Sequence, residues 1–444
     1  MQWQKAMRRG ICLGTMGAMF AFTSATMFAE PTQQPSYRTV TEAYDWGPEV
    51  SKVIVNLGHK IKQADIHAKD FQVHVWRELA EGVNPPAPDT IQRPSVVLGA
   101  ESTSDKDLAG ERKVLHAYVS DAQGNPATQG NYVVLEFAVA PNDTLGAAMN
   151  FDPHSYLNNW VKPHYTITTK HEVIDNNQGD IRPQADKFTY GTQMIEGRMS
   201  YPYASYEPKS AGKHPLIIWL HGMGEGGNTP SIPIMGNKAV AFADDAIQKY
   251  FDGAYVLVPQ ARTYWMQGFQ GLADGTSIYE DSLMKFIKSY VQAHPNIDSQ
   301  RIYIGGDSNG GYMTMLLVRD NPQYFAAAFP TCEGLKDSLI SAQDLQALTQ
   351  TPIWFIAAKT DTTLPPKDYA VPTFERLKQA GAGVHFSYFD KVIDTSGKYK
   401  QADGTAYEYP GHWSWIYVYN DACQDQENGK PVKLFQWMAE KVRK

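Results

Sequence analysis

The sequence predicts two domains of different class: an all-β sandwich, followed by an α/β domain with a mostly parallel sheet. Between residues 35 and 175, apolar residues occur in short strand-like runs, and no helix-period segment of any length interrupts them. From about residue 180 to the end, continuous apolar runs alternate with segments whose apolar residues recur every three or four positions. A chain of 444 residues is long enough to bury two cores.

In the first domain, the segment 121–126 combines Asp, Gly, Asn and Pro, which is typical of a hairpin turn. The polar segment 176–187 contains Gly179 and Pro183 and is expected to connect the two domains. The predicted strands are residues 53–57, 71–76, 114–118 and 132–139, of which the second and fourth alternate with period two.

In the second domain, residues 282–294 carry apolar side chains at i, i+3, i+4, i+7 and i+8, the stripe of a helix packed on a sheet. Helices are also expected at 238–250 and 432–442. The predicted buried strands are 216–220, 254–258, 302–304, 326–329, 352–358 and 384–389.

The most informative motif is Gly306-Asp307-Ser308-Asn309-Gly310, which lies between a predicted strand and a helix-forming apolar run. A G-x-S-x-G sequence in this setting predicts a nucleophile elbow, a sharp turn that exposes the serine hydroxyl at a helix N-terminus. The alternative is a glycine-rich turn with a surface serine. We take Ser308 as the candidate nucleophile.

A nucleophilic serine needs a base, and the base needs an acid that orients it. Asp361 follows the predicted strand 352–358, at the end of the sheet where active sites of α/β folds collect. His412 follows in a loop after Pro410 and Gly411, which completes the order Ser, Asp, His. Asp307 and Asp390 are rival acids, and a structural role is the alternative for Asp361 and for His412.

The predicted strand 216–220 is followed by His221-Gly222-Met223-Gly224-Glu225. A loop of this kind supplies a backbone N–H donor to an oxyanion, and the residue after the nucleophile supplies another, each worth roughly 3–4 kcal/mol. We assign the donors to Met223, or its neighbour Gly222, and to Asn309. His221 is expected to brace the loop, as is Glu225 through an ion pair.

Residues from about 180 to 444 resemble bacterial α/β-hydrolases of the secreted-esterase and prolyl-oligopeptidase-like type, near polyhydroxybutyrate-depolymerase-like and feruloyl-esterase-like enzymes. This resemblance implies an α/β-hydrolase fold with Ser308 as nucleophile, His412 as general base and acid, and Asp361 as orienting acid. A looser resemblance to secreted esterases with an N-terminal immunoglobulin-like domain implies that fold for residues 35–175. The matching residues are His221 to Glu225, Val258 to Gln260, Gly306 to Gly311, Asp361 and Gly411 to Trp413.

Residues 1–29 have the features of a signal peptide, with Lys5, Arg8 and Arg9 ahead of the apolar stretch 11–22. Cleavage is expected after Ala29 or Ala25, and an uncleaved membrane anchor is the alternative. We therefore expect an exported protein, periplasmic or extracellular, with no stable membrane insertion after cleavage. In that compartment Cys332 and Cys423 either form a disulfide or remain buried free thiols.

The amino-acid composition bears on which ligands the protein could bind. Lys and Arg total 40 against 47 acidic residues, with no basic run, so nucleic-acid binding is unsupported. The histidines show no metal-ligand spacing, and neither a metal nor a cofactor is expected.

Trp265 and Trp413 lie in predicted loops near the catalytic end, where they either line a substrate pocket or pack in the core.

The leading hypothesis is a serine carboxylesterase that acts on a small-molecule or glycan-linked ester through an acyl-enzyme. A serine peptidase of prolyl-oligopeptidase-like type is the first alternative. The second is a non-catalytic surface-binding protein with a vestigial hydrolase domain. The sequence leaves the oligomeric state open.

Overall fold

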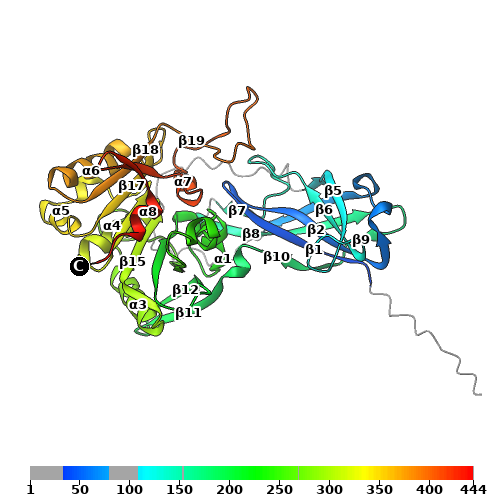
Figure 1. Ribbon diagram of the computed structural model, residues 1–444, viewed down its shortest axis with the longest axis horizontal. Coiled ribbons are helices and arrows are strands. Elements are labelled where there is room, and N and C mark those ends of the chain that lie inside the picture. The colour runs from blue at the N-terminus through cyan, green and yellow to red at the C-terminus, as the bar shows by residue number, and fades with distance from the viewer. Residues whose placement is uncertain (1–33, 80–108, 153–154, 269, 444) are drawn as a thin grey trace, which may run out of the picture.

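The computed structural model describes residues 34–79, 109–152, 155–268 and 270–443. The predicted signal peptide, residues 1–29, lies outside these ranges. Figure 1 shows a two-layer body of strands at one end of the molecule and an α/β body at the other. Within the described ranges, no helix is long and apolar enough to cross a membrane.

The first body is a β-sandwich. One sheet has the order β10-β1-β2-β6-β5, and the other has β4-β3-β8-β7 with β9 on β8. Val53 and Val133 of the first sheet pack against Val75 and Ile167 of the second in one buried cluster. The strands are β1 (Ser36–Tyr44), β2 (Gly47–Lys62), β3 (Gln72–Leu79), β4 (Ala109–Glu111), β5 (Val114–Ser120), β6 (Gln129–Phe137), β7 (Met149–Asp152), β8 (Leu157–Thr168), β9 (Val173–Ile174) and β10 (Asn177–Ile181).

The four strands predicted here correspond to β2, β3, β5 and β6. The turn at 121–126 is also present, and Asp121 Oδ1 accepts the backbone N–H groups of Gln123 and Asn125. The segment 176–187 differs from the prediction, because β10 within it pairs with β1. Its side chains are mostly exposed, so the strand depends on backbone pairing and leaves no apolar pattern in the sequence.

The second body is built on an eight-stranded sheet in the order β11-β12-β14-β13-β15-β16-β17-β18. From β14 to β18 all neighbours are parallel, whereas β11 and β12 are antiparallel additions at one edge. The strands are β11 (Thr189–Ile195), β12 (Met199–Tyr206), β13 (His214–Leu220), β14 (Tyr255–Pro259), β15 (Ile297–Asp307), β16 (Ala327–Thr331), β17 (Ile353–Ala358) and β18 (Val384–Phe389).

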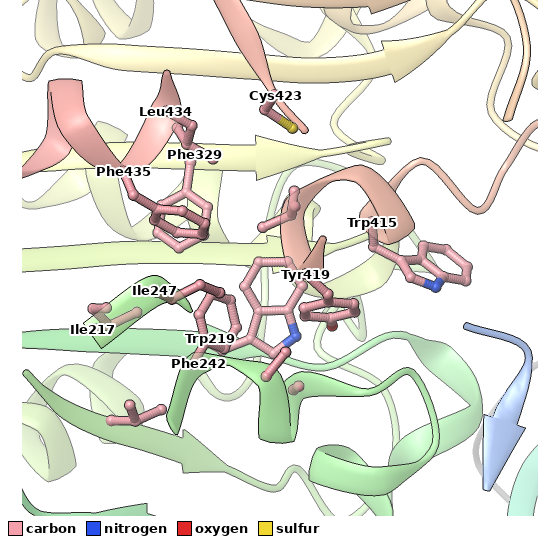
Figure 2. Packing of buried hydrophobic residues seen from close by; sticks show 14 of the residues in the cluster. Ile217, Trp219, Phe242, Ile247, Phe329, Trp415, Tyr419, Cys423, Leu434 and Phe435 are labelled. Atoms are coloured by element: carbon pink, nitrogen blue, oxygen red, sulfur yellow. The ribbon is translucent and has the colours of Figure 1, made fainter. Parts of the chain in front are cut away.

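Both faces of this sheet are buried, since successive residues of one strand enter different clusters: Ile217 and Trp219 lie in one, and Leu216 and Ile218 in the other. Figure 2 shows the first cluster, in which Trp219 lies between the sheet and side chains of other elements. The helices are α1 (Ser231–Met235), α2 (Asp245–Gln248), α3 (Glu280–Ala293), α4 (Asn309–Asp320), α5 (Ala342–Leu348), α6 (Ala370–Gln379), α7 (Trp415–Tyr419) and α8 (Leu434–Ala439).

The helix predicted at 282–294 is confirmed by α3, and two other predicted helices are shorter than expected. The segment 238–250 forms a 3-10 turn (Ala239–Ala243) and then α2, because the backbone of Asp244 between them is extended. The segment 432–442 begins in strand β22 (Lys430–Lys433), which pairs with β21 (Gln424–Glu427), and only α8 is helical.

The β7–β8 hairpin of the sandwich reaches into the α/β body. Leu157 is 1% exposed and belongs to a core cluster of the large sheet. The Tyr264 hydroxyl donates to the Ser155 carbonyl (3.1 Å), and the Trp160 indole donates to Ser231 Oγ (3.0 Å). The sandwich therefore packs against the second body, at the carboxyl end of the central strands of the large sheet.

Candidate active site

Ser308 sits at the sharp turn between β15 and α4, with φ of +54° and ψ of −109°. Few non-glycine residues adopt such a backbone, and the surrounding structure has to enforce it. The flanking glycines permit the turn: a Cβ at Gly310 would lie 1.8 Å from the Leu220 carbonyl oxygen, and one at Gly306 would lie 2.5 Å from the same atom. The predicted strand–turn–helix geometry is confirmed.

A chain of hydrogen bonds joins the three residues predicted to react. His412 Nε2 lies 2.9 Å from Ser308 Oγ, and His412 Nδ1 lies 2.8 Å from Asp361 Oδ2. The other oxygen of Asp361 accepts the backbone N–H groups of Thr363 and Leu364, both at 2.9 Å. An ionised carboxylate can only accept hydrogen bonds, so a histidine that donates from Nδ1 to Asp361 has its Nε2 available to accept from the serine.

The rival acids lie in other environments. Asp390 is exposed and its Oδ1 pairs with Lys359 Nζ at 2.6 Å. Asp307 is fully buried and accepts the Asn237 side-chain amide at 3.0 Å. Of the three candidates, Asp361 is the acid to which His412 is hydrogen-bonded.

The loop after β13 is braced from inside the fold. His221 is fully buried, its Nδ1 donates to the Gly222 carbonyl (2.6 Å), and its Nε2 accepts the Ala261 N–H (3.0 Å). Burial lowers the pKa of His221 to about 4, so the ring is neutral. These contacts match the bracing role that was predicted for His221.

Two expectations about this loop were wrong. The N–H of Gly222 donates to Glu225 Oε2 at 3.1 Å, so it is committed inside the protein and unavailable to an oxyanion. For the oxyanion donor that this loop supplies, Met223 or Gly222 was expected, and Met223 is the one that remains. Glu225 makes this hydrogen bond where an ion pair was expected; in the described part of the chain its buried carboxyl pairs with no lysine or arginine.

A cavity of about 420 Å³ opens at the serine. Ser308, His412, Met223 and Trp413 line it from the α/β body, so Trp413 takes the pocket-lining role of the two left open for it. Phe151 and Asn158 line it from β7 and β8 of the sandwich, and sequence reasoning missed both.

The two sandwich residues touch the loop after β13. A Cβ at Gly224 would lie 3.2 Å from Asn158 Nδ2 and 3.6 Å from Phe151 Cδ2. Glycine at this position therefore lets the sandwich approach the site closely. No sequence signal marks these residues, because their proximity to Ser308 depends on how the two bodies dock.

Of the two roles left open for Trp265, the structure has core packing, and the residue does not line this cavity. It is fully buried, with its ring centroid 4.9 Å from that of His221 and 5.7 Å from that of Tyr279. Its backbone N–H donates to Asn309 Oδ1 at 2.6 Å. Trp265 thus links the loop after β14 to the first residue of α4, while its ring packs between His221 and Tyr279.

Of the two alternatives for the cysteines, the structure has the free thiols: Cys332 and Cys423 are both buried and unbridged. Burial raises the pKa of both thiols, so neither is a thiolate at neutral pH. Cys332 directly follows β16 and has a φ of +36°.

Residues 36–181 match the family model of the esterase Ig-like N-terminal domain, and residues 265–337, which include the elbow, match that of the prolyl oligopeptidase family. A search of curated proteins found no match. The crystal structure of a thermostable esterase is 22% identical, with a TM-score of 0.68, over 92% of this chain and 100% of that one.

Two other solved structures are much less similar. A ferulic acid esterase is 14% identical (TM-score 0.37; 46% of this chain, 90% of that chain), and an acylaminoacyl peptidase from Pyrococcus horikoshii is 16% identical (TM-score 0.36; 55% and 43%). The family matches agree with the resemblance drawn from the sequence and support a serine hydrolase. The chain thus has an Ig-like N-terminal domain of the kind found in esterases, followed by a domain of the α/β-hydrolase type.

Proposed function

We propose that this protein is an exported serine esterase that hydrolyses carboxylic esters at Ser308. The observation that carries the proposal is the hydrogen-bonded chain Ser308–His412–Asp361 at a strained elbow that opens into a cavity. Such a constellation is recognised by its geometry and by the roles of its members. Export rests on the signal-peptide features of residues 1–29.

In the proposed reaction, Ser308 Oγ attacks the ester carbonyl while His412 Nε2 takes its proton. Asp361 holds the imidazole in the required tautomer and stabilises the imidazolium. The backbone N–H groups of Met223 and Asn309 donate hydrogen bonds to the negatively charged oxygen of the tetrahedral intermediate and so stabilise it. His412 then protonates the leaving alcohol, and a water molecule, deprotonated by the same histidine, releases the acid from the acyl-enzyme.

The cavity favours a small ester. Its volume of about 420 Å³ holds a short acyl chain or one aromatic ring, and Phe151 and Trp413 offer apolar walls. We therefore expect a small-molecule or glycan-linked ester as substrate.

A serine peptidase is the second candidate, favoured by the match of residues 265–337 to the prolyl oligopeptidase family. Both reactions would use the same three residues. They differ in the leaving group, so a comparison of esters with amides separates them.

The test is hydrolysis of p-nitrophenyl esters from acetate to octanoate, a ferulate ester and peptide p-nitroanilides by the mature protein and by Ser308→Ala. We expect ester hydrolysis by the wild type and a fall of roughly 10⁶-fold in kcat for the variant. Faster cleavage of peptides than of esters would favour the peptidase. Equal inertness of both proteins toward all substrates would favour a binding protein with a vestigial hydrolase domain.

A further inference from the structure

Two buried carboxyl groups belong to the lining of the cavity that holds Ser308. Glu225 is 1% exposed and Asp307 is fully buried, and both line this cavity. They meet at Gly222: its N–H donates to Glu225 Oε2 at 3.1 Å, and a Cβ on it would lie 2.7 Å from Asp307 Oδ2. One carboxyl belongs to the oxyanion loop (residues 221–227) and the other precedes the nucleophile, so the pair joins the two halves of the site.

The surroundings of the pair contain no compensating lysine or arginine among the described residues. Lys238 follows Asn237 in the chain, but its Nζ donates to Asp45 Oδ1 and to Asn420 Oδ1, both at 2.7 Å. The titratable groups that face the pair are His412, Tyr419 and Cys332, and the remaining contacts are the Asn237 side-chain amide, the Trp219 indole and the backbone N–H groups of Gly222 and Asn237.

Burial decides the charge of the pair. It raises the pKa of Asp307 to about 7. It also raises the pKa of Glu225 well above its usual range, and the nearby charge of Asp307 adds to this effect. Two adjacent carboxylates without a cation cannot both ionise in a buried site at neutral pH, so at least one proton stays on the pair.

We propose that Glu225 and Asp307 form a carboxyl pair that keeps at least one proton at neutral pH and positions the oxyanion loop against the nucleophile elbow. The proposal deepens the esterase function proposed above and rests on it. Glu225 holds Gly222, and through it the N–H of Met223, in place. Loss of the last proton at alkaline pH puts a second negative charge beside the oxyanion, and kcat declines.

Two variants and a control test the pair in the full mature protein with p-nitrophenyl acetate. Glu225→Gln keeps an acceptor for the Gly222 N–H but carries no ionisable group, so the alkaline decline of kcat disappears. Glu225→Ala removes the acceptor, and kcat falls about 10–100-fold with KM nearly unchanged, less than the ~10²–10³-fold loss of a whole oxyanion donor. Glu49→Gln, a buried carboxyl of the sandwich, is the matched control and keeps the wild-type profile.

Infrared difference spectra report the retained proton without any need for activity. Wild type minus Glu225→Gln or minus Asp307→Asn at pH 7 is expected to contain the C=O stretch of a protonated carboxyl. An unchanged alkaline limb in Glu225→Gln, or the absence of that band from both difference spectra, overturns the proposal. If Glu225→Ala fails to fold, Glu225→Gln and Asp307→Asn decide. If wild type hydrolyses no ester, the esterase function fails and the infrared spectra still decide whether the pair exists.

Discussion

The two walls of the cavity are built in different ways. The wall on the α/β body consists of strand ends and tight turns, where glycines at positions 306 and 310 and backbone hydrogen bonds fix each reacting group. The wall on the sandwich consists of Phe151 and Asn158, which reach the site only because a hairpin of a separate domain docks there. Reaction geometry is thus local to one body, and the shape of the substrate space depends on docking.

The largest effect is expected on the first wall. Asp361→Asn keeps the shape of the side chain but stabilises the wrong tautomer of His412, so kcat should fall about 10⁴-fold while the fold persists. Asp390→Asn is the matched control, since Asp390 is exposed and paired with Lys359. The measurement is kcat for an ester, with circular dichroism for the fold. Loss of activity in the control variant, and not in Asp361→Asn, would reverse the assignment.

The elbow itself is tested by Gly310→Ala. Alanine is the better helix former, so propensity alone predicts a slight gain in stability. The added Cβ would lie 1.8 Å from the Leu220 carbonyl, however, and we expect a loss of about 3 kcal/mol or more in the free energy of unfolding. Gly383→Ala is the control, because its Cβ would meet no atom within 4 Å. Equal denaturation midpoints for the two variants would contradict the strained elbow.

The same difference between the walls explains what the sequence could predict. Ser308, Asp361 and His412 could be found because each follows a strand or a glycine motif in the order that the chemistry needs. The commitment of the Gly222 N–H to Glu225 depends on side-chain packing, as does the burial of Trp265. Strand β10 was missed for a related reason, since its exposed polar side chains give no periodic signal.

The second wall is tested by Phe151→Ala. Removal of the ring takes away apolar contact with the substrate worth roughly 1–2 kcal/mol, so kcat/KM for octanoate or ferulate esters should fall about 5–30-fold, mainly through KM. Acetate esters should change less, because they fill less of the cavity. Trp76→Ala is the control: that ring is on β3, 48% exposed and stacked on His164. An equal loss for acetate and octanoate would indicate that Phe151 supports the fold instead.

The smallest effect concerns the pH dependence of stability, on the sandwich side of the molecule. Burial raises the pKa of Glu49 to about 8. A carboxyl whose pKa is raised on folding contributes stability below its unfolded pKa, and this contribution is lost as the pH rises from about 4.5 toward 8. Glu49→Gln keeps an acceptor for the Trp46 indole, which donates to Glu49 Oε1 at 2.8 Å, and has no proton to lose. Its Tm should therefore exceed that of wild type by a few degrees at pH 8, with little difference at pH 4. Thermal melts at the two pH values measure this directly, and a variant that gains nothing at pH 8 would show that Glu49 is already ionised in the folded protein.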